Sequence, residues 1–158
     1  MPETDQNTMS DAPPILIVDN QPKLLRLVVE LMTRLGFADV DGVPDALEAL
    51  EKMRSRRYAL VISDFDMEPM DGLQFLREIR ADTELMNTPF ILTETSFAFE
   101  DINVAHLAGA DAFLLKPFDI ALLKTKLKQV LNRKPRRREA KPPTESNLSL
   151  EFPLLGKF

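Results

Sequence analysis

The chain has 158 residues, of which 44% are apolar and 28% are charged, and its formal net charge is −5. This length supports one domain of roughly 100 to 150 residues with flanking segments, and the negative charge argues against general binding to nucleic acid. Because the chain has no cysteine and a single histidine, thiolate and histidine-cluster metal sites are excluded, and any metal must be held by oxygen atoms.

The first residues of the chain predict neither a signal peptide nor a folded element. Residues 1–13 are polar and carry no periodic apolar pattern, so we expect a disordered arm before a folded domain at residues 14–131. No apolar run reaches the roughly 18 residues that a membrane span requires. The sequence therefore predicts a cytoplasmic protein with no membrane partner.

The first half of the domain alternates strand and helix patterns. A continuous apolar run at 15–18 predicts a central strand that is buried on both faces. Apolar residues then recur at three-and-four spacing from Pro22 to Gly36, which predicts a helix. Its predicted buried face consists of Leu24, Leu27, Val28, Leu31, Met32 and Leu35. A weaker strand is expected at 37–43, followed by a helix that buries Ala46, Leu47, Leu50 and Met53.

The second half repeats the pattern. Strands are predicted at 58–63, 88–93 and 112–115, and helices through 73–79, 102–108 and 120–131. Five alternating pairs with short connections imply right-handed crossovers and an α/β fold with a doubly wound parallel sheet. No G-x-G-x-x-G motif follows the first strand, so the phosphate loop of a dinucleotide site is absent.

Polar residues mark the carboxyl ends of the predicted strands, where such sheets carry their sites. These residues are Asp19, Asn20, Asp64, Glu94, Thr95 and Lys116. Two carboxylates that converge in one crevice are costly unless a cation compensates them, and Mg²⁺ suits an all-oxygen site that keeps several waters. A carboxylate nucleophile, Mg²⁺ and a lysine together predict phosphoryl transfer.

Three blocks of sequence now carry a resemblance to a known family. They are Ile-Leu-Ile-Val-Asp-Asn at 15–20, Val-Ile-Ser-Asp at 61–64 with Met-Glu-Pro-Met-Asp-Gly at 67–72, and Leu-Leu-Lys-Pro-Phe at 114–118. Over residues 14–131 the chain resembles the receiver domain of two-component response regulators. The resemblance implies a flavodoxin-like fold with five helices and strand order 2-1-3-4-5. It also implies an aspartate that receives a phosphoryl group from a histidine kinase or a histidine phosphotransfer protein.

The resemblance also implies roles for individual residues. Asp64 matches the phosphoacceptor, and Lys116 matches the family's lysine, which a cis bond to Pro117 is expected to aim inward. The implied metal site consists of Asp19, Asn20, Asp64 and the backbone carbonyl of Asp66. Phe113 matches the aromatic switch position. With no effector domain expected, output would pass through contacts with a downstream protein, and the chain would promote its own phosphorylation and dephosphorylation without acting as an enzyme on other substrates.

The sequence departs from the family pattern at three places. Asn20 replaces the second acid of the usual acidic pair, which should weaken Mg²⁺ affinity. A count without gaps back from Lys116 places Glu94 at the switch position, where the family has a serine or threonine. Thr93 and Thr95 flank that position, so a shift of one residue would restore a hydroxyl. Pro69 stands two residues after Met67, where the family has proline directly after the methionine.

Two alternative functions follow from these observations. Asn20 and Glu94 favour a pseudo-receiver, an interaction module that keeps the fold and is not switched by phosphate. The spacing of Asp64 and Asp66 permits a haloacid-dehalogenase-like phosphatase, but Glu68 stands where that class needs a small hydroxyl residue. Mg²⁺-dependent labelling separates the pseudo-receiver from a functional receiver.

Residues outside these motifs leave further alternatives open. His106 has no partner ligands and is interpreted as a packing or surface residue. Phe97 and Phe99 fit either a core or a partner-binding face. Residues 132–158 are predicted to form a basic, proline-rich linker and a short apolar tail. The linker is interpreted as solvated, with an acidic partner or nucleic acid as the alternative, and the tail as a docking peptide.

Overall fold

The computed structural model describes residues 13–132 of the chain. Its strands are β1 (Ile15–Val18), β2 (Val40–Val43), β3 (Leu60–Asp64), β4 (Phe90–Glu94) and β5 (Ala112–Leu115). Its helices are α2 (Pro22–Arg34), α3 (Ala46–Ser55), α4 (Gly72–Ala81), α5 (Phe99–Ala108) and α6 (Ile120–Leu131). The predicted arm at 1–13 and tail at 132–158 lie almost entirely outside the described residues. No helix in the described part of the chain is long and apolar enough to cross a membrane.

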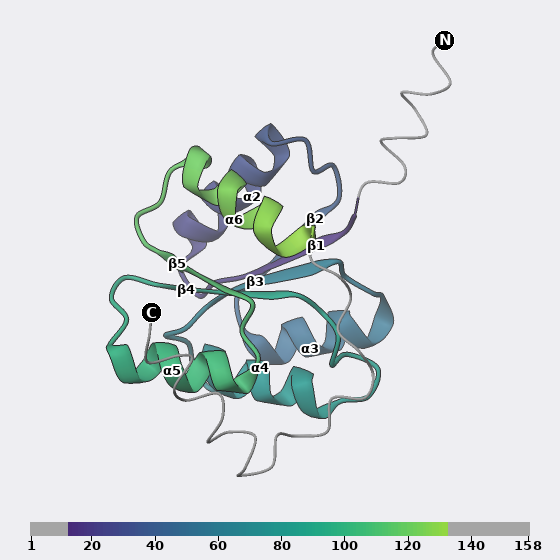
Figure 1. Ribbon diagram of the computed structural model, residues 1–158. Helices are drawn as coiled ribbons and strands as arrows, with labels where there is room; N and C mark the ends of the chain where they lie inside the picture. The colour runs from purple at the N-terminus through teal and green to yellow at the C-terminus, as the bar shows by residue number, and fades with distance from the viewer. Residues whose placement is uncertain (1–12, 133–158) are drawn as a thin grey trace.

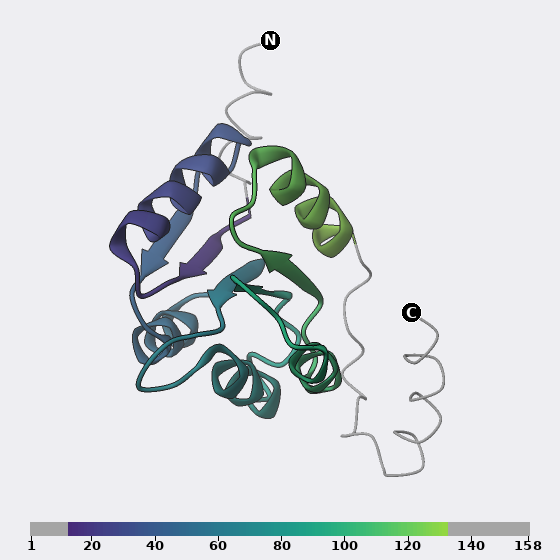
Figure 2. The ribbon, with the colours of Figure 1, turned by 90° about the vertical axis from the view of Figure 1, so that its left-hand side faces the viewer.

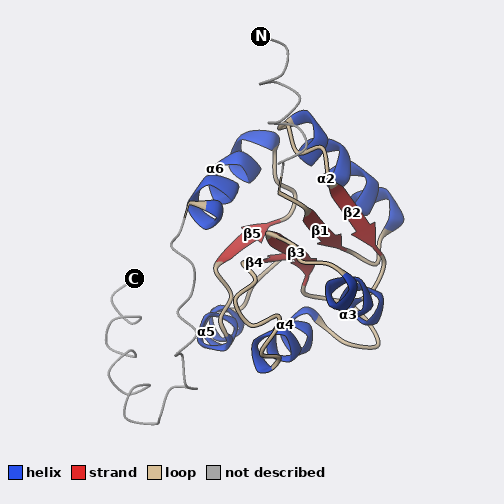
Figure 3. Ribbon diagram, turned by 90° about the vertical axis from the view of Figure 1, so that its right-hand side faces the viewer, coloured by secondary structure: helices blue, strands red, loops and turns tan. Residues whose placement is uncertain are grey.

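All five strands are parallel, in the order β2-β1-β3-β4-β5. Helices α2 and α6 cover one face of this sheet, and α3, α4 and α5 cover the other (Figures 1 and 3). The predicted flavodoxin-like fold with five helices is therefore confirmed. In the view of Figure 2, α2 and α6 lie side by side above the sheet, with the other three helices below it.

Alternation along the strands builds a separate apolar core on each face of the sheet. Leu16, Val61 and Leu92 point to the α3–α5 side, whereas Ile15, Ile62 and Ile91 point to the α2–α6 side. All of them are at most 1% exposed. Because successive side chains in a strand point to opposite faces, a strand covered on both sides must be apolar throughout. Each such side chain stabilises the fold by roughly 1.5–3 kcal/mol.

Side-chain caps fix where three of the helices begin, all of them near the carboxyl edge of the sheet. Asp45, Asp71 and Asp119 accept hydrogen bonds from backbone N–H groups in the first turns of α3, α4 and α6. Gly109 ends α5 in the left-handed conformation, with φ 107°. These caps hold the loops around the site in defined positions.

Two predicted helix faces were partly wrong. Leu27 and Leu47 were assigned to the core, but they are 49% and 50% exposed. Each follows or precedes a truly buried position by one residue, which turns it about 100° away from the sheet. The ends of several elements also shifted: β2 begins at Val40 rather than at 37, and α5 begins at Phe99 rather than at 102.

Candidate functional site

The carboxyl ends of β1, β3 and β5 bring three predicted site residues together. Lys116 Nζ lies 3.1 Å from Asp19 Oδ2 and 3.0 Å from Asp64 Oδ1. The three side chains are at most 9% exposed. β1 and β3 are direct neighbours in the sheet, so their terminal aspartates converge, and the long lysine side chain reaches them from β5. The Lys116–Pro117 peptide bond is cis, as expected from the resemblance.

This cluster contains more negative than positive charge, because one ammonium group faces two carboxylates. Burial raises the pKa of Asp64, Lys116 opposes that rise, and the charges of Asp19 and Glu94 add to it. Burial acts to lower the pKa of Lys116, but the close pairing with Asp64 and the charge of Asp19 outweigh it, so the pKa is raised. Lys116 is therefore held as a cation. Asp64 Oδ1 is buried and accepts no hydrogen bond of good geometry from the described residues.

Two further residues of the predicted metal site flank the cluster. Asn20 follows Asp19 and is exposed, and Asp66 is exposed in the loop after β3. Asp19 Oδ1 accepts a hydrogen bond of 2.9 Å from the Gln21 N–H, which orients this carboxylate. No group of three or more His, Cys, Asp or Glu residues able to hold a metal occurs in residues 13–132. The oxygen donors brought together in the crevice are thus the two buried carboxylates.

The end of β4 places an acid beside this cluster. Thr93 lies opposite Asp64 in the strand register, and its buried hydroxyl donates to the Ser63 carbonyl over 3.4 Å. Glu94 is half-buried at the end of β4, and its Oε1 accepts a 2.6 Å hydrogen bond from the Thr95 N–H. Its charge contributes to the raised pKa of Asp64. The carboxylate of Glu94 therefore acts on Asp64, while Thr95 is exposed.

Comparison with known proteins decides which family this site belongs to. The family model of the response regulator receiver domain matches residues 15–128. The chain belongs to this family. It is a response regulator receiver of two-component signal transduction, as the sequence blocks predicted, and the alternative of a haloacid-dehalogenase-like phosphatase is set aside.

Curated relatives and solved structures agree with the family model. The chain is 35% identical over 119 residues to the chemotaxis protein CheY-3 of Vibrio cholerae, covering 75% of this chain and 92% of that protein. It is 30% identical over 119 residues to the chemotaxis protein CheY of Pseudomonas aeruginosa, covering 75% and 96%. The crystal structure of CheY4 from Vibrio cholerae superposes with a TM-score of 0.72 at 28% identity, covering 75% and 98%.

A solved receiver domain with a bound metal is also similar. It is the receiver domain of a sensor histidine kinase from Pseudomonas aeruginosa PAO1, with a magnesium ion coordinated in its active site cleft. It matches this receiver with a TM-score of 0.71 at 26% identity, covering 77% of this chain and 99% of that one. Members of the family thus bind Mg²⁺ in this cleft.

Three aromatic rings of the receiver form a row beside Asp64. Phe97 contacts Phe65 with a centroid separation of 6.3 Å and Phe113 with one of 5.4 Å, both edge-to-face. Phe113, the predicted switch aromatic, is half-buried against the α3–α5 core. Phe99 is 72% exposed. Phe97 therefore packs against the core, as one of the two interpretations expected, whereas a partner-binding role for the exposed Phe99 stays a prediction.

Gly72 is a site residue whose importance sequence reasoning missed. A Cβ at this position would overlap the Asp64 carbonyl oxygen and lie 2.8 Å from Phe65 Cα. The Gly72 N–H also donates to the Phe65 carbonyl over 2.8 Å. The Asp-Gly pair at the start of α4 was interpreted as a turn marker, and no side-chain pattern signals that the helix meets β3 backbone to backbone.

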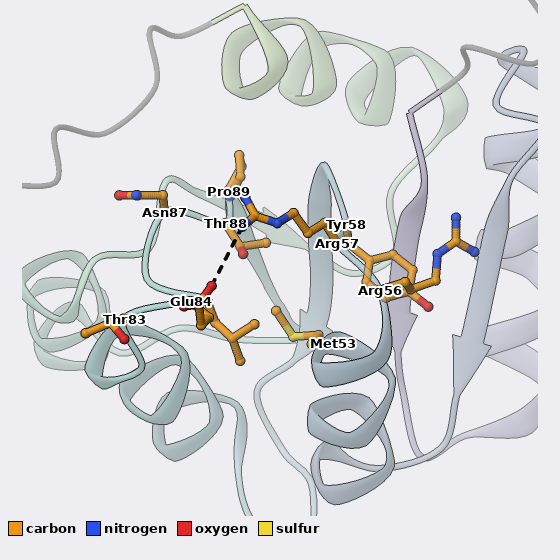
Figure 4. A pocket seen from close by; sticks show the side chains of 10 residues that line it. Met53, Arg56, Arg57, Tyr58, Thr83, Glu84, Asn87, Thr88 and Pro89 are labelled. Atoms are coloured by element: carbon orange, nitrogen blue, oxygen red, sulfur yellow. Dashed lines mark ion pairs between the residues drawn. The ribbon is translucent and has the colours of Figure 1, made fainter.

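A surface pocket of about 160 Å³ lies at the opposite edge of the receiver's sheet. Figure 4 shows it between the end of α3 and the loop that precedes β4, with Tyr58 and Pro89 among its lining residues. Arg57 and Glu84 form an ion pair of 3.7 Å there, but both side chains are more than three-quarters exposed. No predicted site residue lines this pocket. His106 is also remote from Asp64 in sequence and exposed, as expected of a surface histidine.

Proposed function

We propose that this receiver is switched by transfer of a phosphoryl group from phosphohistidine to Asp64. The observation that carries the proposal is the buried Asp19–Lys116–Asp64 cluster at the carboxyl edge of the sheet. One carboxylate there can act as nucleophile while the lysine balances part of the charge. The donor is a histidine kinase or a histidine phosphotransfer protein, the target is a downstream protein, and the compartment is the cytoplasm.

The two carboxylates fit a resident Mg²⁺ ion by their chemistry. Both are oxygen donors at one crevice, they exceed the positive charge of Lys116, and Asp64 Oδ1 lacks a hydrogen bond within the described residues. Mg²⁺ takes one or two carboxylates and fills its remaining positions with water and phosphate oxygens. The carboxylates of Asp19 and Asp64 would bind the ion, and the Asn20 side chain and the Asp66 backbone carbonyl would supply further oxygen atoms at the rim of the site. When bound, the ion supplies charge neutralisation for the incoming phosphoryl group.

Asp64 and Lys116 divide the work of the transfer step. An ionised Asp64 oxygen attacks phosphorus, so that an O–P bond forms as the N–P bond of phosphohistidine breaks and the imidazole leaves with its electron pair, to be protonated from solvent. Because burial raises the pKa of Asp64, the cations around it are needed to keep it ionised. Lys116, already 3.0 Å from Asp64, is placed to pair with a phosphoryl oxygen. The receiver thereby promotes its own phosphorylation.

Glu94 sets the strength of the switch in this proposal. The hydroxyl of Thr93 is committed to the Ser63 carbonyl, and Thr95 is exposed, which supports Glu94 as the residue at the switch position. A carboxylate there repels a phosphoryl dianion. Phe113 packs against Phe97, and it is the aromatic ring that would move when Asp64 is phosphorylated.

A labelling experiment tests the acceptor. The full chain is incubated with a small phosphodonor such as acetyl phosphate and Mg²⁺, and the added mass is measured on the intact protein. We expect label on the wild type and on Asp66→Asn, whose exposed side chain lies two residues away, and none on Asp64→Asn. If Asp64→Asn still takes up label, the phosphoacceptor is a residue other than Asp64. A wild type that takes no label, from this donor or from a phosphorylated histidine phosphotransfer protein, identifies a pseudo-receiver.

A further inference from the structure

Helices α2 and α6 enclose an apolar pocket far from the phosphoacceptor. They lie on the same face of the sheet (Figures 2 and 3), and the pocket between their last turns has a volume of about 210 Å³. Leu35, Phe37, Leu127 and Leu131 supply its apolar lining, and Lys124, Lys128 and Asn132 complete it. Both helices run antiparallel to the strands, so the pocket lies at the sheet edge opposite Asp64.

The chain itself leaves the domain at this pocket. Leu131 is the last residue of α6 and Asn132 is its C-cap, and both line the pocket. Residues 133–158, which lie outside the described residues, therefore start at its rim. Any apolar segment that follows on the chain is kept at a high local concentration near this pocket.

One part of that segment matches the pocket in apolar character and in charge. Residues 148–152 read Leu-Ser-Leu-Glu-Phe, with three large apolar residues at every second position. The rim carries Lys124 and Lys128, two of the three lysines of α6, and the segment carries Glu151, with Glu145 shortly before it. The fifteen residues at 133–147 connect the two, and closing a loop of this length costs little more than closing a shorter one.

We propose that residues 148–152 of the same chain dock into the α2–α6 pocket. A volume of about 210 Å³ is below the roughly 300 Å³ of ordinary ligand sites, which suits one large side chain from a peptide. Phe152 enters the pocket, and Glu151 lies beside Lys124 and Lys128, whose long side chains reach over the rim. The site is independent of the phosphoacceptor and of the proposed function.

The absence of cysteine makes a direct test possible, because one introduced cysteine is labelled uniquely. A nitroxide is attached to Ser149→Cys in the full chain, and the paramagnetic loss of amide NMR signal is recorded. We expect strong losses at Leu35, Phe37 and Lys128, and none at Arg77 on the other face of the sheet. Losses confined to another surface, or absent at the pocket, overturn the proposal.

Charge exchange then tests the assigned contact. In the labelled chain, Lys128→Glu should abolish most of the signal loss at Leu35 and Phe37, and adding Glu151→Lys should restore it. Lys126→Glu is the matched control, because Lys126 lies on the same helix and does not line the pocket. The control should leave the loss unchanged. Failure of the double exchange to restore the loss would refute the role of these charges.

A mixing experiment identifies whose segment is bound. Isotope-labelled chain without nitroxide is mixed with unlabelled chain that carries it. Signal loss in the isotope-labelled partner would show docking into a second copy and would overturn the intramolecular proposal. We expect no loss in the mixture, and we expect Phe152→Ser to remove the loss within a single chain while leaving the domain's amide spectrum otherwise intact.

Discussion

Two largely buried cations, Arg80 and Lys116, lie in opposite parts of this receiver, and their partners differ in kind. All five N–H donors of Arg80 are engaged: they bond to the carbonyls of Gly109, Met86 and Thr88 and to Asp111. Asp111 in turn accepts from the Phe90 N–H. Lys116, by contrast, faces the carboxylates of Asp19 and Asp64 and leaves excess negative charge in the crevice.

The two clusters differ in how completely their hydrogen bonds and charges are paired, and not in how deeply they are buried. This pairing distinguishes a structural cluster from a functional one. The Arg80 cluster joins the end of α4 to the start of β4 and to the turn before β5. Every N–H donor of Arg80 has a partner, so the role of this cluster is structural. The Lys116 cluster retains the capacity to take a cation and an anionic group, because its charges do not balance. A buried ion cluster that is incompletely satisfied therefore points to a site.

Removing the satisfied cation should have the largest effect on stability. Arg80→Ala removes five hydrogen bonds to the Gly109, Met86 and Thr88 carbonyls and to Asp111, and we expect it to lower the free energy of unfolding by about 3 kcal/mol. Arg77→Ala, an exposed arginine on the same helix, should change it by less than about 0.5 kcal/mol. Urea denaturation followed by circular dichroism measures both. A similar loss for the two variants would remove the distinction between the clusters.

Reducing the negative charge of the unbalanced cluster should strengthen anion binding. Glu94→Thr removes a carboxylate that acts on Asp64 and restores a hydroxyl, so affinity for beryllofluoride in Mg²⁺ should rise about tenfold, or ~1.4 kcal/mol. Titration followed by NMR of the Asp64 region measures it. Unchanged affinity in Glu94→Thr, together with a lost response in Thr95→Ala, would assign the switch to Thr95 instead.

Adding negative charge at the rim should strengthen cation binding by a smaller amount. Asn20 is exposed, so Asn20→Asp is expected to raise Mg²⁺ affinity about fivefold, on the scale of a solvent-exposed charge interaction. Isothermal titration calorimetry with MgCl₂ gives the dissociation constants. Asp39→Asn, a change far from the crevice, serves as the control and should leave Mg²⁺ affinity as it is.

The pH dependence of stability gives the most delicate comparison. In Mg²⁺-free buffer the folded state binds a proton at Asp64 at higher pH than the unfolded chain, whose carboxyl titrates near 3.8. The free energy of unfolding should therefore increase as pH falls through the raised pKa of Asp64. The gain is about 1.4 kcal/mol for each pH unit by which the folded pKa exceeds the unfolded one, and it is complete below pH 3.8. Asp64→Asn should lack this gain. Parallel stability curves of the two proteins between pH 7 and pH 4 would contradict the assignment.

Most of the fold could be predicted because its three inner strands, β1, β3 and β4, are buried on both faces. A run such as Ile15–Val18 has few alternatives to a central parallel strand, and the polar residues that end such runs identify the crevice. Asp19, Asp64 and Lys116 are brought together as expected for that reason. The exposed leucines at 27 and 47 were misassigned because helical periodicity marks an apolar stripe without showing how wide the covering layer is.

Arg80 could not be predicted, for a physical reason that applies to many such residues. Its partners are mainly backbone carbonyls, which every residue possesses, and they come from two loops, one close to Arg80 in sequence and one 29 residues away. A single arginine on an amphipathic helix has the same pattern as a solvated one. Gly72 was missed for the converse reason: its role consists in the side chain that it lacks.

The close approach at Gly72 also determines which helix can report the state of the receiver. At its start, α4 meets the Asp64 backbone without an intervening side chain. At its other end, Arg80 bonds to the loops that precede β4 and β5. Both ends of α4 are therefore attached to the rest of the domain. The N-cap of α5, Ala98, provides no side-chain hydrogen bond, and the first residue of the helix, Phe99, projects into solvent. If phosphorylation of Asp64 switches this receiver as proposed, we expect a partner to detect the change at α5 and to bind both states with equal affinity at α4.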